Sequence, residues 1–322
     1  MRTFPKPVVV ASRCFEFDAC RYNGQTIPNN LVRALEPWVE FRPVCPELEI
    51  GLGVPRDPVR VVRAGGERKL VQPASGRDLT SLMRGFSETF LRSLSDVDGF
   101  ILKSRSPSCG IRDAKEFPDA ENEIATGKGA GLFAERVVSK FPGLAVEDEG
   151  RLRNFRIREH FLTKLYTLAR FRDVKKSGTA NALVNFHTEN KLLLMSYSQK
   201  EMRALGRITA NTEGKRPEIL IGEYGEGLRH ALSSPQRRSS SINVLMHALG
   251  YFSDRLTGRE KARFLDLLEA YRNERIPLSA VLTVLESWVI EYDEDYLACQ
   301  TFFEPYPKEL MEISDSGKGR DV

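Results

Sequence analysis

The residues of this sequence that stand out chemically are cysteines placed after predicted strands. Three of the five cysteines each follow a strand-like run, and two of these runs, residues 8–11 and 100–102, are continuously apolar, as in strands buried on both faces. Cys14 follows residues 8–11, Cys45 follows residues 39–44, and Cys109 follows residues 100–102 by a short loop. Parallel strands present their carboxyl ends at one edge of a sheet, where ligands bind, so these three thiols are expected to converge.

Three converging thiols fit packing, a zinc ion or an iron–sulfur cluster. A single free cysteine is as often a small buried apolar residue as it is a ligand, but the joint placement at strand ends disfavours that interpretation for all three. Zinc takes four ligands, and only Cys20 offers a further ligand nearby. A cubane cluster can be held by three thiolates, which leaves one iron open as a soft Lewis acid that attracts sulfur. We therefore expect a 4Fe–4S cluster, with zinc as the alternative.

Groups that could act as acid, base or electrostatic partner lie next to these cysteines. Glu47 follows Cys45 by two residues, where a carboxylate could serve as general base beside a metal. Taken alone, it is more often a solvated loop acid. Ser106 and Ser108 directly precede Cys109, and the loop that begins at Gly51 ends in the guanidinium of Arg56. We expect Glu47, Ser106 and Ser108 to be catalytic, and Arg56 to bind substrate.

Composition and chain pattern indicate a soluble protein. Of the 322 residues, 41% are hydrophobic and 29% charged, which excludes a disordered or fibrous chain. No apolar run approaches the roughly 20 residues needed to cross a bilayer, and the N-terminal apolar block is too short for a secretory signal. We therefore expect a cytoplasmic protein, with no membrane partner and no disulfide framework.

The elements that must position the cysteines form an α/β pattern in the first half of the chain. Strand-like and helix-like segments alternate to about residue 149, with a hairpin over residues 58–72, so we expect a mostly parallel, Rossmann-like sheet covered by helices. Almost everything from residue 151 to Leu310 has helical periodicity, beginning with one long helix over residues 151–172. We therefore predict an α/β domain over residues 1–149 and an all-α domain over residues 150–322. The second domain is expected to end in a disordered tail from Ser314.

Several motifs in the first half resemble those of the thiouracil desulfidase (TudS-like) family over about residues 5–147. They are Ser12-Arg13-Cys14, Cys20-Arg21-Tyr22-Asn23-Gly24, Cys45-Pro46-Glu47 with Gly51 to Arg56, and Ser106-Pro107-Ser108-Cys109-Gly110. The resemblance implies a 4Fe–4S cluster held by Cys14, Cys45 and Cys109, whose open iron binds the sulfur of a thiolated uracil. It implies Glu47 as the catalytic carboxylate and a serine of the Ser106–Ser108 segment beside it. The chain departs from the family pattern at Phe15-Glu16-Phe17, and Cys20 stays outside the implied ligand set.

The second half resembles a helical domain of uncharacterised function that is often fused to this one. The matching residues are Phe155-Arg156-Ile157-Arg158-Glu159, Phe186-His187-Thr188 with Lys191 and Met195, and Leu205-Gly206-Arg207. Two-domain proteins of this kind look like desulfidases that act on 4-thiouridine in tRNA. The resemblance therefore implies tRNA as the substrate.

The distribution of charge supports a nucleic-acid partner independently. Residues 1–150 hold 21 basic and 21 acidic residues, residues 151–216 hold 15 and 5, and residues 217–322 hold 12 and 18. A solvated helical face is the ordinary explanation of such a run, but this excess is larger than solubility requires. We therefore expect a surface that binds phosphates. Its predicted members are Arg153, Arg156, His160, Lys164, Arg170, Lys175, Lys176, Arg203 and Arg207, the first five as a stripe on one helix.

The expected function is conversion of 4-thiouridine in tRNA to uridine, with release of sulfide. His187 shares a helical face with Lys191 and Met195, and we expect it to contact substrate, although an interface or core position also fits this spacing. One alternative is a desulfidase of free thiolated uracil or nucleosides. Another is a non-catalytic metal-containing sensor that binds RNA. The oligomeric state does not follow from the sequence.

Overall fold

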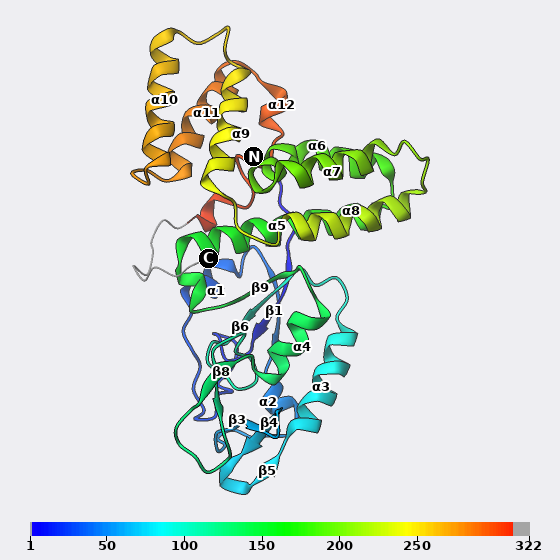
Figure 1. Cartoon of the computed structure of the whole chain (residues 1–322), viewed down its shortest axis with the longest axis vertical. Helices are drawn as coiled ribbons and strands as arrows, with labels where there is room; N and C mark the ends of the chain where they lie inside the picture. Colours follow the sequence, from blue (N-terminus) through cyan, green and yellow to red (C-terminus); the bar gives the residue numbers. More distant parts are fainter. Residues whose placement is uncertain (1, 312–322) are drawn as a thin grey trace. The chain divides into compact units, whose positions relative to one another are not determined.

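The computed structural model of this chain describes residues 2–311 (Figure 1). These residues form two compact units, one of residues 5–169 with 309–311 and one of residues 170–308 with 2–4. The division falls inside helix α5 (Phe155–Ser177). The domain boundary predicted from the sequence, at residues 149 and 150, lies before this helix.

A four-stranded parallel sheet forms the centre of the first unit. Its order is β2 (Glu40–Val44), β1 (Val8–Ser12), β6 (Gly99–Leu102) and β9 (Ala145–Asp148). All three neighbouring pairs are parallel, with Val9 opposite both Phe41 and Gly99. β1 is buried along its whole length because it lies between two strands, and its Val-Val-Val-Ala run suits such a place. The predicted α/β class with a parallel sheet is confirmed.

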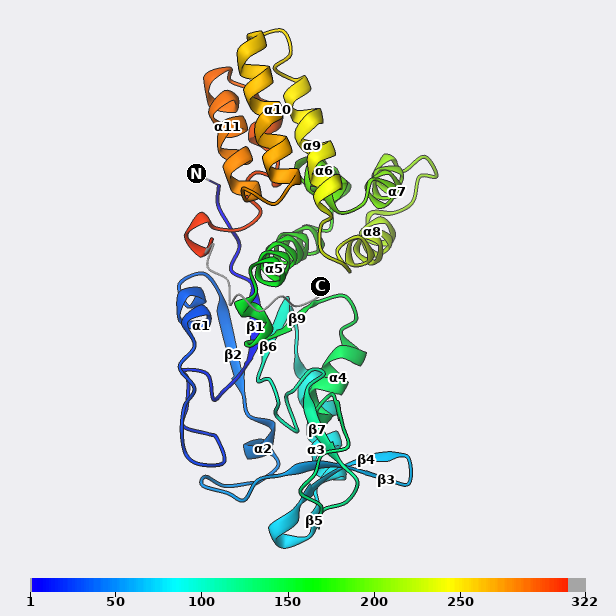
Figure 2. The ribbon, with the colours of Figure 1, turned by 60° about the vertical axis from the view of Figure 1, so that its left-hand side comes forward.

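A second, mixed sheet belongs to the same unit. Its order is β5 (Arg77–Asp78), β4 (Glu67–Gln72), β3 (Arg60–Ala64), β7 (Ala114–Phe117) and β8 (Gly127–Gly129). β3 and β4 are the antiparallel hairpin predicted over residues 58–72, whereas β3 pairs with β7 in parallel. The sequence did not predict β7 and β8, because β8 is Gly-Lys-Gly and carries no apolar alternation. Figure 2 shows β3, β4 and β5 beyond the end of β2 where α2 begins.

The helices of this unit are α1 (Asn30–Leu35), α2 (Pro46–Glu49), α3 (Thr80–Ser93), α4 (Leu132–Lys140) and the first part of α5. One apolar core joins both sheets to α3 and α4. It includes Val10 of β1, Phe100 of β6, Val61 of β3, Met83 of α3 and Phe133 of α4, all fully buried. The sheet edge that carries the cysteines therefore rests on a continuous core.

The rest of the described chain is helical, as expected. After α5 come α6 (Ala180–Tyr197), α7 (Gln199–Ala210), α8 (Pro217–Ala231), α9 (Arg238–Gly250), α10 (Gly258–Arg272), α11 (Leu278–Glu291) and α12 (Asp295–Ala298). The expected helix over residues 151–172 is instead a 3-10 turn, Arg151–Arg153, followed by α5. Asn154 separates the two, because its side chain accepts a hydrogen bond from the Ile157 amide and so caps α5.

Within residues 2–311, no helix combines the length and the apolar character that a membrane crossing requires. The polar tail predicted from Ser314 lies outside the described residues.

Candidate active site

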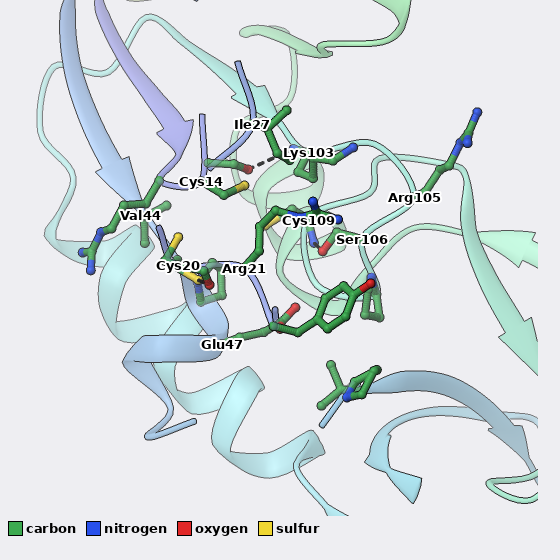
Figure 3. Close-up of a pocket in the computed structure, with 18 of the residues that line it drawn as sticks. Cys14, Cys20, Arg21, Ile27, Val44, Glu47, Lys103, Arg105, Ser106 and Cys109 are labelled. Carbon is green, nitrogen blue, oxygen red and sulfur yellow. Dashed lines mark hydrogen bonds between the residues drawn. The ribbon is translucent and has the colours of Figure 1, made fainter. Parts of the chain in front are cut away.

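The three predicted cysteines line one cavity of about 390 Å³ in the α/β unit, and Cys20 lines it with them. Cys14 lies two residues beyond β1, Cys45 directly follows β2, and Cys109 lies in the loop after β6. These strands are neighbours in a parallel sheet, so their carboxyl ends open on the same side. Figure 3 shows Cys14, Cys20 and Cys109 around the same space as Glu47.

The thiols of the cavity lie near enough to shift one another's pKa values. The hydrogen bond with the Cys14 thiol is the main cause that raises the pKa of Cys20 to about 11. The hydrogen bond with Cys20, followed by burial, raises the pKa of Cys45, and burial raises the pKa of Cys109. These three residues are therefore thiols at neutral pH. A metal centre that binds them must displace their protons, which a cationic metal does readily.

Glu47 is held beside Cys45 by the local structure of α2. Cys45 occupies the N-cap position and Pro46 the first position of this short helix, so Glu47 falls in its first turn. Its carboxylate accepts two hydrogen bonds from Arg56 at Oε2, from Nη2 at 2.8 Å and from Nε at 3.0 Å. The side chains of Arg56 and Glu47 are only 6% and 14% exposed. This is a largely buried ion pair facing the thiols.

Arg56 is committed to the protein rather than available to substrate. Besides its two bonds to Glu47, its Nη1 donates to the carbonyls of Cys20 at 3.0 Å and Gly53 at 3.1 Å. Arg56 does line the cavity, as expected, but its donors hold Glu47 and the Cys20 loop in place. We therefore replace its predicted role in substrate binding by a role in positioning Glu47.

The two serines before Cys109 have different places. The Ser106 hydroxyl accepts hydrogen bonds from the amides of Ser108 at 3.2 Å and Cys109 at 3.0 Å, and Ser106 lines the cavity. Ser108 is fully buried, and its hydroxyl donates to Glu47 Oε1 at 3.0 Å. Ser106 thus shapes the loop, whereas Ser108 binds the carboxylate.

The N-terminus of α4 anchors this serine loop. The amides of Phe133 and Ala134 both donate to the Ser108 carbonyl at 3.0 Å. A Cβ added at Gly131 would lie 2.5 Å from the Ser108 carbonyl carbon and oxygen, so only glycine allows this approach.

Cations that the sequence interpretation did not single out surround the cavity. They are Arg13, Arg21, Lys103 and Arg105. Lys103 pairs with Glu149, and Arg13 pairs with Glu49 at 2.8 Å. Arg105 is exposed, and Figure 3 shows its side chain extending away from the thiols. One of these cations could have been predicted from the Cys-Arg-Tyr-Asn-Gly motif. This motif places Arg21 and the exposed aromatic ring of Tyr22 next to a cavity cysteine.

The basic stripe predicted on the first long helix is not a uniformly exposed surface. Arg153 and Arg156 are exposed, but Lys164 is only 8% exposed and His160 is half-buried. Burial lowers the pKa of Lys164 to about 8, and burial, assisted by Lys164, lowers that of His160 to about 4. The expectation that Lys164 faces solvent is wrong, because residues 161–169 of α5 are all buried, and His160 is only partly exposed.

The other predicted nucleic-acid residues belong to the helical unit. Arg170 is half-buried, with its guanidinium 5.1 Å from the centre of the Phe4 ring and 3.3 Å from the Pro305 carbonyl. The remaining four, by contrast, are exposed: Lys175, Lys176, Arg203 and Arg207. Fewer of the predicted basic side chains are therefore exposed than the sequence pattern indicates.

His187 does not line the cavity and is a core residue of the helical unit. It is 9% exposed, and its Nδ1 lies 3.1 Å from the Tyr224 hydroxyl. Its other ring nitrogen lies beside Gly206 of α7, and burial lowers its pKa. The structure places His187 in the core position that its spacing also allows, away from the cavity. Its helical face packs inward, with Met195 also buried.

The donor set of the cavity suits an iron–sulfur cluster better than a single ion. In the described part of the chain, no group of three or more His, Cys, Asp or Glu side chains is arranged to hold one metal ion. A cluster makes a different demand, since each of its irons takes a separate thiolate. Thiols from three separate segments, Cys14, Cys45 and Cys109, meet that demand, with Cys20 as a further soft donor.

Two separate family models match different parts of this chain. Residues 9–149 match the family model "2-thiouracil desulfurase", and residues 191–307 match the model "Protein of unknown function (DUF1722)". Uncharacterized protein YbgA of Escherichia coli (strain K12) is 28% identical over 158 residues, which cover 48% of this chain and 93% of YbgA. Uncharacterized protein YbbK of Bacillus subtilis (strain 168) is 34% identical over 110 residues, which cover 32% of this chain and 73% of YbbK.

Among solved structures, the [4Fe-4S]-dependent thiouracil desulfidase TudS is similar to 46% of this chain, at 28% identity over 93% of its own length and with a TM-score of 0.38. Through residues 9–149, this chain belongs to the 2-thiouracil desulfurase family.

Proposed function

We propose that this chain removes sulfur from 4-thiouridine in tRNA, yielding uridine and sulfide. The observation that carries the proposal is the cavity itself, in which strand-end thiols face a buried Glu47–Arg56–Ser108 network. Membership of the 2-thiouracil desulfurase family supports the reaction class, since its name specifies a thiolated pyrimidine.

Cys14, Cys45 and Cys109 are the proposed ligands of a 4Fe–4S cluster. When bound, the cluster supplies an iron without a ligand among these three thiolates, a soft Lewis acid with affinity for sulfur. Cysteines from three different strand ends suit this cofactor because the rigid sheet fixes their spacing.

Glu47 is the proposed general base. Replacing C=S by C=O consumes one water and releases hydrogen sulfide, so a group at the site must take a proton from water. Glu47 lines the cavity, and its Oε1, which accepts one hydrogen bond from Ser108, keeps a second acceptor site, whereas Oε2 accepts two bonds from Arg56. The two bonds from Arg56 and the one from Ser108 fix the orientation of this carboxylate. Apolar walls from Ile27, Val59 and Pro107 suit a pyrimidine ring.

The exposed cations support a polyanionic substrate. Positive charge is concentrated in residues 151–216, and Arg153, Arg156, Arg203 and Arg207 are exposed there. Further cations line the cavity, including Arg21 and Arg105. Phosphate contacts of this type give affinity that falls steeply with salt. His160, Lys164 and His187 are not part of the proposed surface, because burial removes them from phosphates.

The test is anaerobic reconstitution with iron and sulfide, followed by incubation with tRNA that contains 4-thiouridine. We expect the near-UV absorbance band of 4-thiouridine to disappear with stoichiometric release of sulfide. Glu47→Gln should retain its iron and lose turnover, which separates base catalysis from cluster assembly. A persistent band with a fully loaded cluster would overturn the proposal.

The salt dependence of binding decides between tRNA and a small substrate. Affinity for tRNA should fall by orders of magnitude between low and moderate salt, and Arg203→Ala with Arg207→Ala should make that dependence shallower. Turnover of free 4-thiouridine that matches or exceeds turnover of tRNA would instead indicate an enzyme of free bases or nucleosides. A purified chain that contains stoichiometric zinc and turns over no thiolated substrate would indicate the non-catalytic sensor that binds RNA.

A further inference from the structure

Cys20 is a fourth thiol of the cavity, which the proposed ligand set does not use. Its side chain is 1% exposed and lines the same space as Cys14, Cys45 and Cys109. Figure 3 shows its side chain beside the same space as those of Cys14 and Cys109. The Cys45 sulfur also lies 3.9 Å from the Cys20 carbonyl oxygen. Cys20 is therefore part of the thiol cluster rather than a neighbour of it.

The backbone holds Cys20 in this place by contacts to catalytic elements. Its carbonyl accepts a hydrogen bond from Arg56 Nη1 at 3.0 Å, the same guanidinium that holds Glu47. Its amide donates to the Asp18 carbonyl at 2.9 Å. Cys20 lies in the loop between β1 and α1, which also carries Cys14.

We propose that Cys20 is an exchangeable fourth ligand of the cluster, bound to the iron that Cys14, Cys45 and Cys109 leave open until substrate sulfur replaces it. This inference rests on the proposed function. A soft iron prefers sulfur to water, and the nearest unassigned sulfur in the cavity is that of Cys20. Four thiolates are the ordinary ligand set of a 4Fe–4S cluster.

The exchange is a ligand substitution without electron transfer. When Cys20 binds, its S–H bond breaks, the proton passes to water and an iron–sulfur bond forms. When substrate binds, its thiocarbonyl sulfur replaces the Cys20 sulfur, which regains a proton from water. Iron and sulfur keep their oxidation states in both directions. The consequence is protection, because the open iron is closed to water and oxidants while no substrate is bound.

The experiment compares the full-length chain with Cys20→Ser and with the matched control Cys299→Ser, whose cysteine lies outside the cavity. All three are reconstituted anaerobically with ⁵⁷Fe and examined by Mössbauer spectroscopy without substrate. We expect four sulfur-ligated irons in the wild type and in Cys299→Ser, and one distinct iron with an oxygen or nitrogen ligand in Cys20→Ser. Under mild oxidation by ferricyanide, Cys20→Ser should lose one iron about tenfold faster than the wild type, as an unprotected iron does.

The wild-type Mössbauer spectrum tests the inference even if Cys20→Ser binds no cluster. A distinct iron with an oxygen or nitrogen ligand in the wild type overturns it. Equal spectra and equal rates of iron loss in wild type and Cys20→Ser also overturn it, while 4-thiouridine turnover in the same preparations leaves the proposed function standing. A wild-type chain that binds no four-iron cluster overturns both.

Discussion

The ion pair between Arg56 and Glu47 allows a stability prediction that depends on its burial. Arg56→Met removes the guanidinium and leaves the Glu47 carboxylate largely buried without its cation. Breaking one partner of a buried pair costs about 3–5 kcal/mol, because the other charge stays desolvated. The Met side chain keeps most of the aliphatic volume, so little of this cost arises from a cavity. We expect Arg56→Met to lower the free energy of unfolding of the α/β unit by about 3 kcal/mol or more.

The double variant separates this explanation from simple loss of contacts. Replacing both members by neutral groups of similar volume is often neutral for stability. Glu47→Gln in the Arg56→Met background removes the uncompensated charge while keeping an oxygen that can accept from Ser108. We therefore expect the double variant to recover most of the stability that Arg56→Met loses, which a double-mutant cycle measures as a coupling energy.

The assay must follow the α/β unit alone. The chain has two tryptophans, Trp38 in this unit and Trp288 in the helical unit. In a Trp288→Phe background, the fluorescence of Trp38 reports urea unfolding of the α/β unit. Two results would refute the reasoning: Arg56→Met within about 1 kcal/mol of its parent, or a double variant no more stable than Arg56→Met.

Three further predictions follow from the same contacts. Folding lowers the pKa of His160 from 6.5 to about 4. Because the unfolded chain then binds a proton more readily, the free energy of unfolding is unaffected by this group above pH 6.5 and falls by about 3 kcal/mol as the pH drops toward 4. Urea unfolding against pH should show this loss in the parent chain but not in His160→Gln. Cys109→Ser should lose iron after anaerobic reconstitution while Cys299→Ser keeps it, and iron analysis showing equal retention would contradict the ligand assignment. Gly131→Ala should displace the carbonyl of Ser108 and destabilise the unit by about 1–3 kcal/mol, with a lower kcat for 4-thiouridine, whereas unchanged stability and kcat would show that the loop tolerates the methyl group.

Periodicity predicted the elements that are long or buried. The Val-Val-Val-Ala run and Phe100–Leu102 are continuous apolar segments, and both became central parallel strands. β8 escaped prediction because its pairing with β7 is set by neighbouring strands rather than by its own residues. Asn154 was not recognised as a cap, so the start of α5 was placed too early.

Side-chain direction is where prediction of the candidate site reached its limit. The spacing of Lys164 and His160 indicates one helical face, but α5 has apolar residues all round, so charge alone did not show which face packs. His187 was assigned to substrate for the same reason, although Tyr224 and Gly206 enclose it. Arg56 was correctly placed at the cavity, but its partners come from Glu47 and from the Cys20 loop, which only folding brings together.

The sequence by itself determined the α/β class, the helical second half and the candidate thiols, because apolar runs, helical periodicity and residue types are local properties of the chain. Only the tertiary structure decided that Cys20 lines one cavity with Cys14 and Cys45, and that Ser108 rather than Ser106 binds Glu47. It also decided which cations remain in solvent. These are relations between segments distant in the chain, and they depend on packing, which sets the direction and the burial of each side chain.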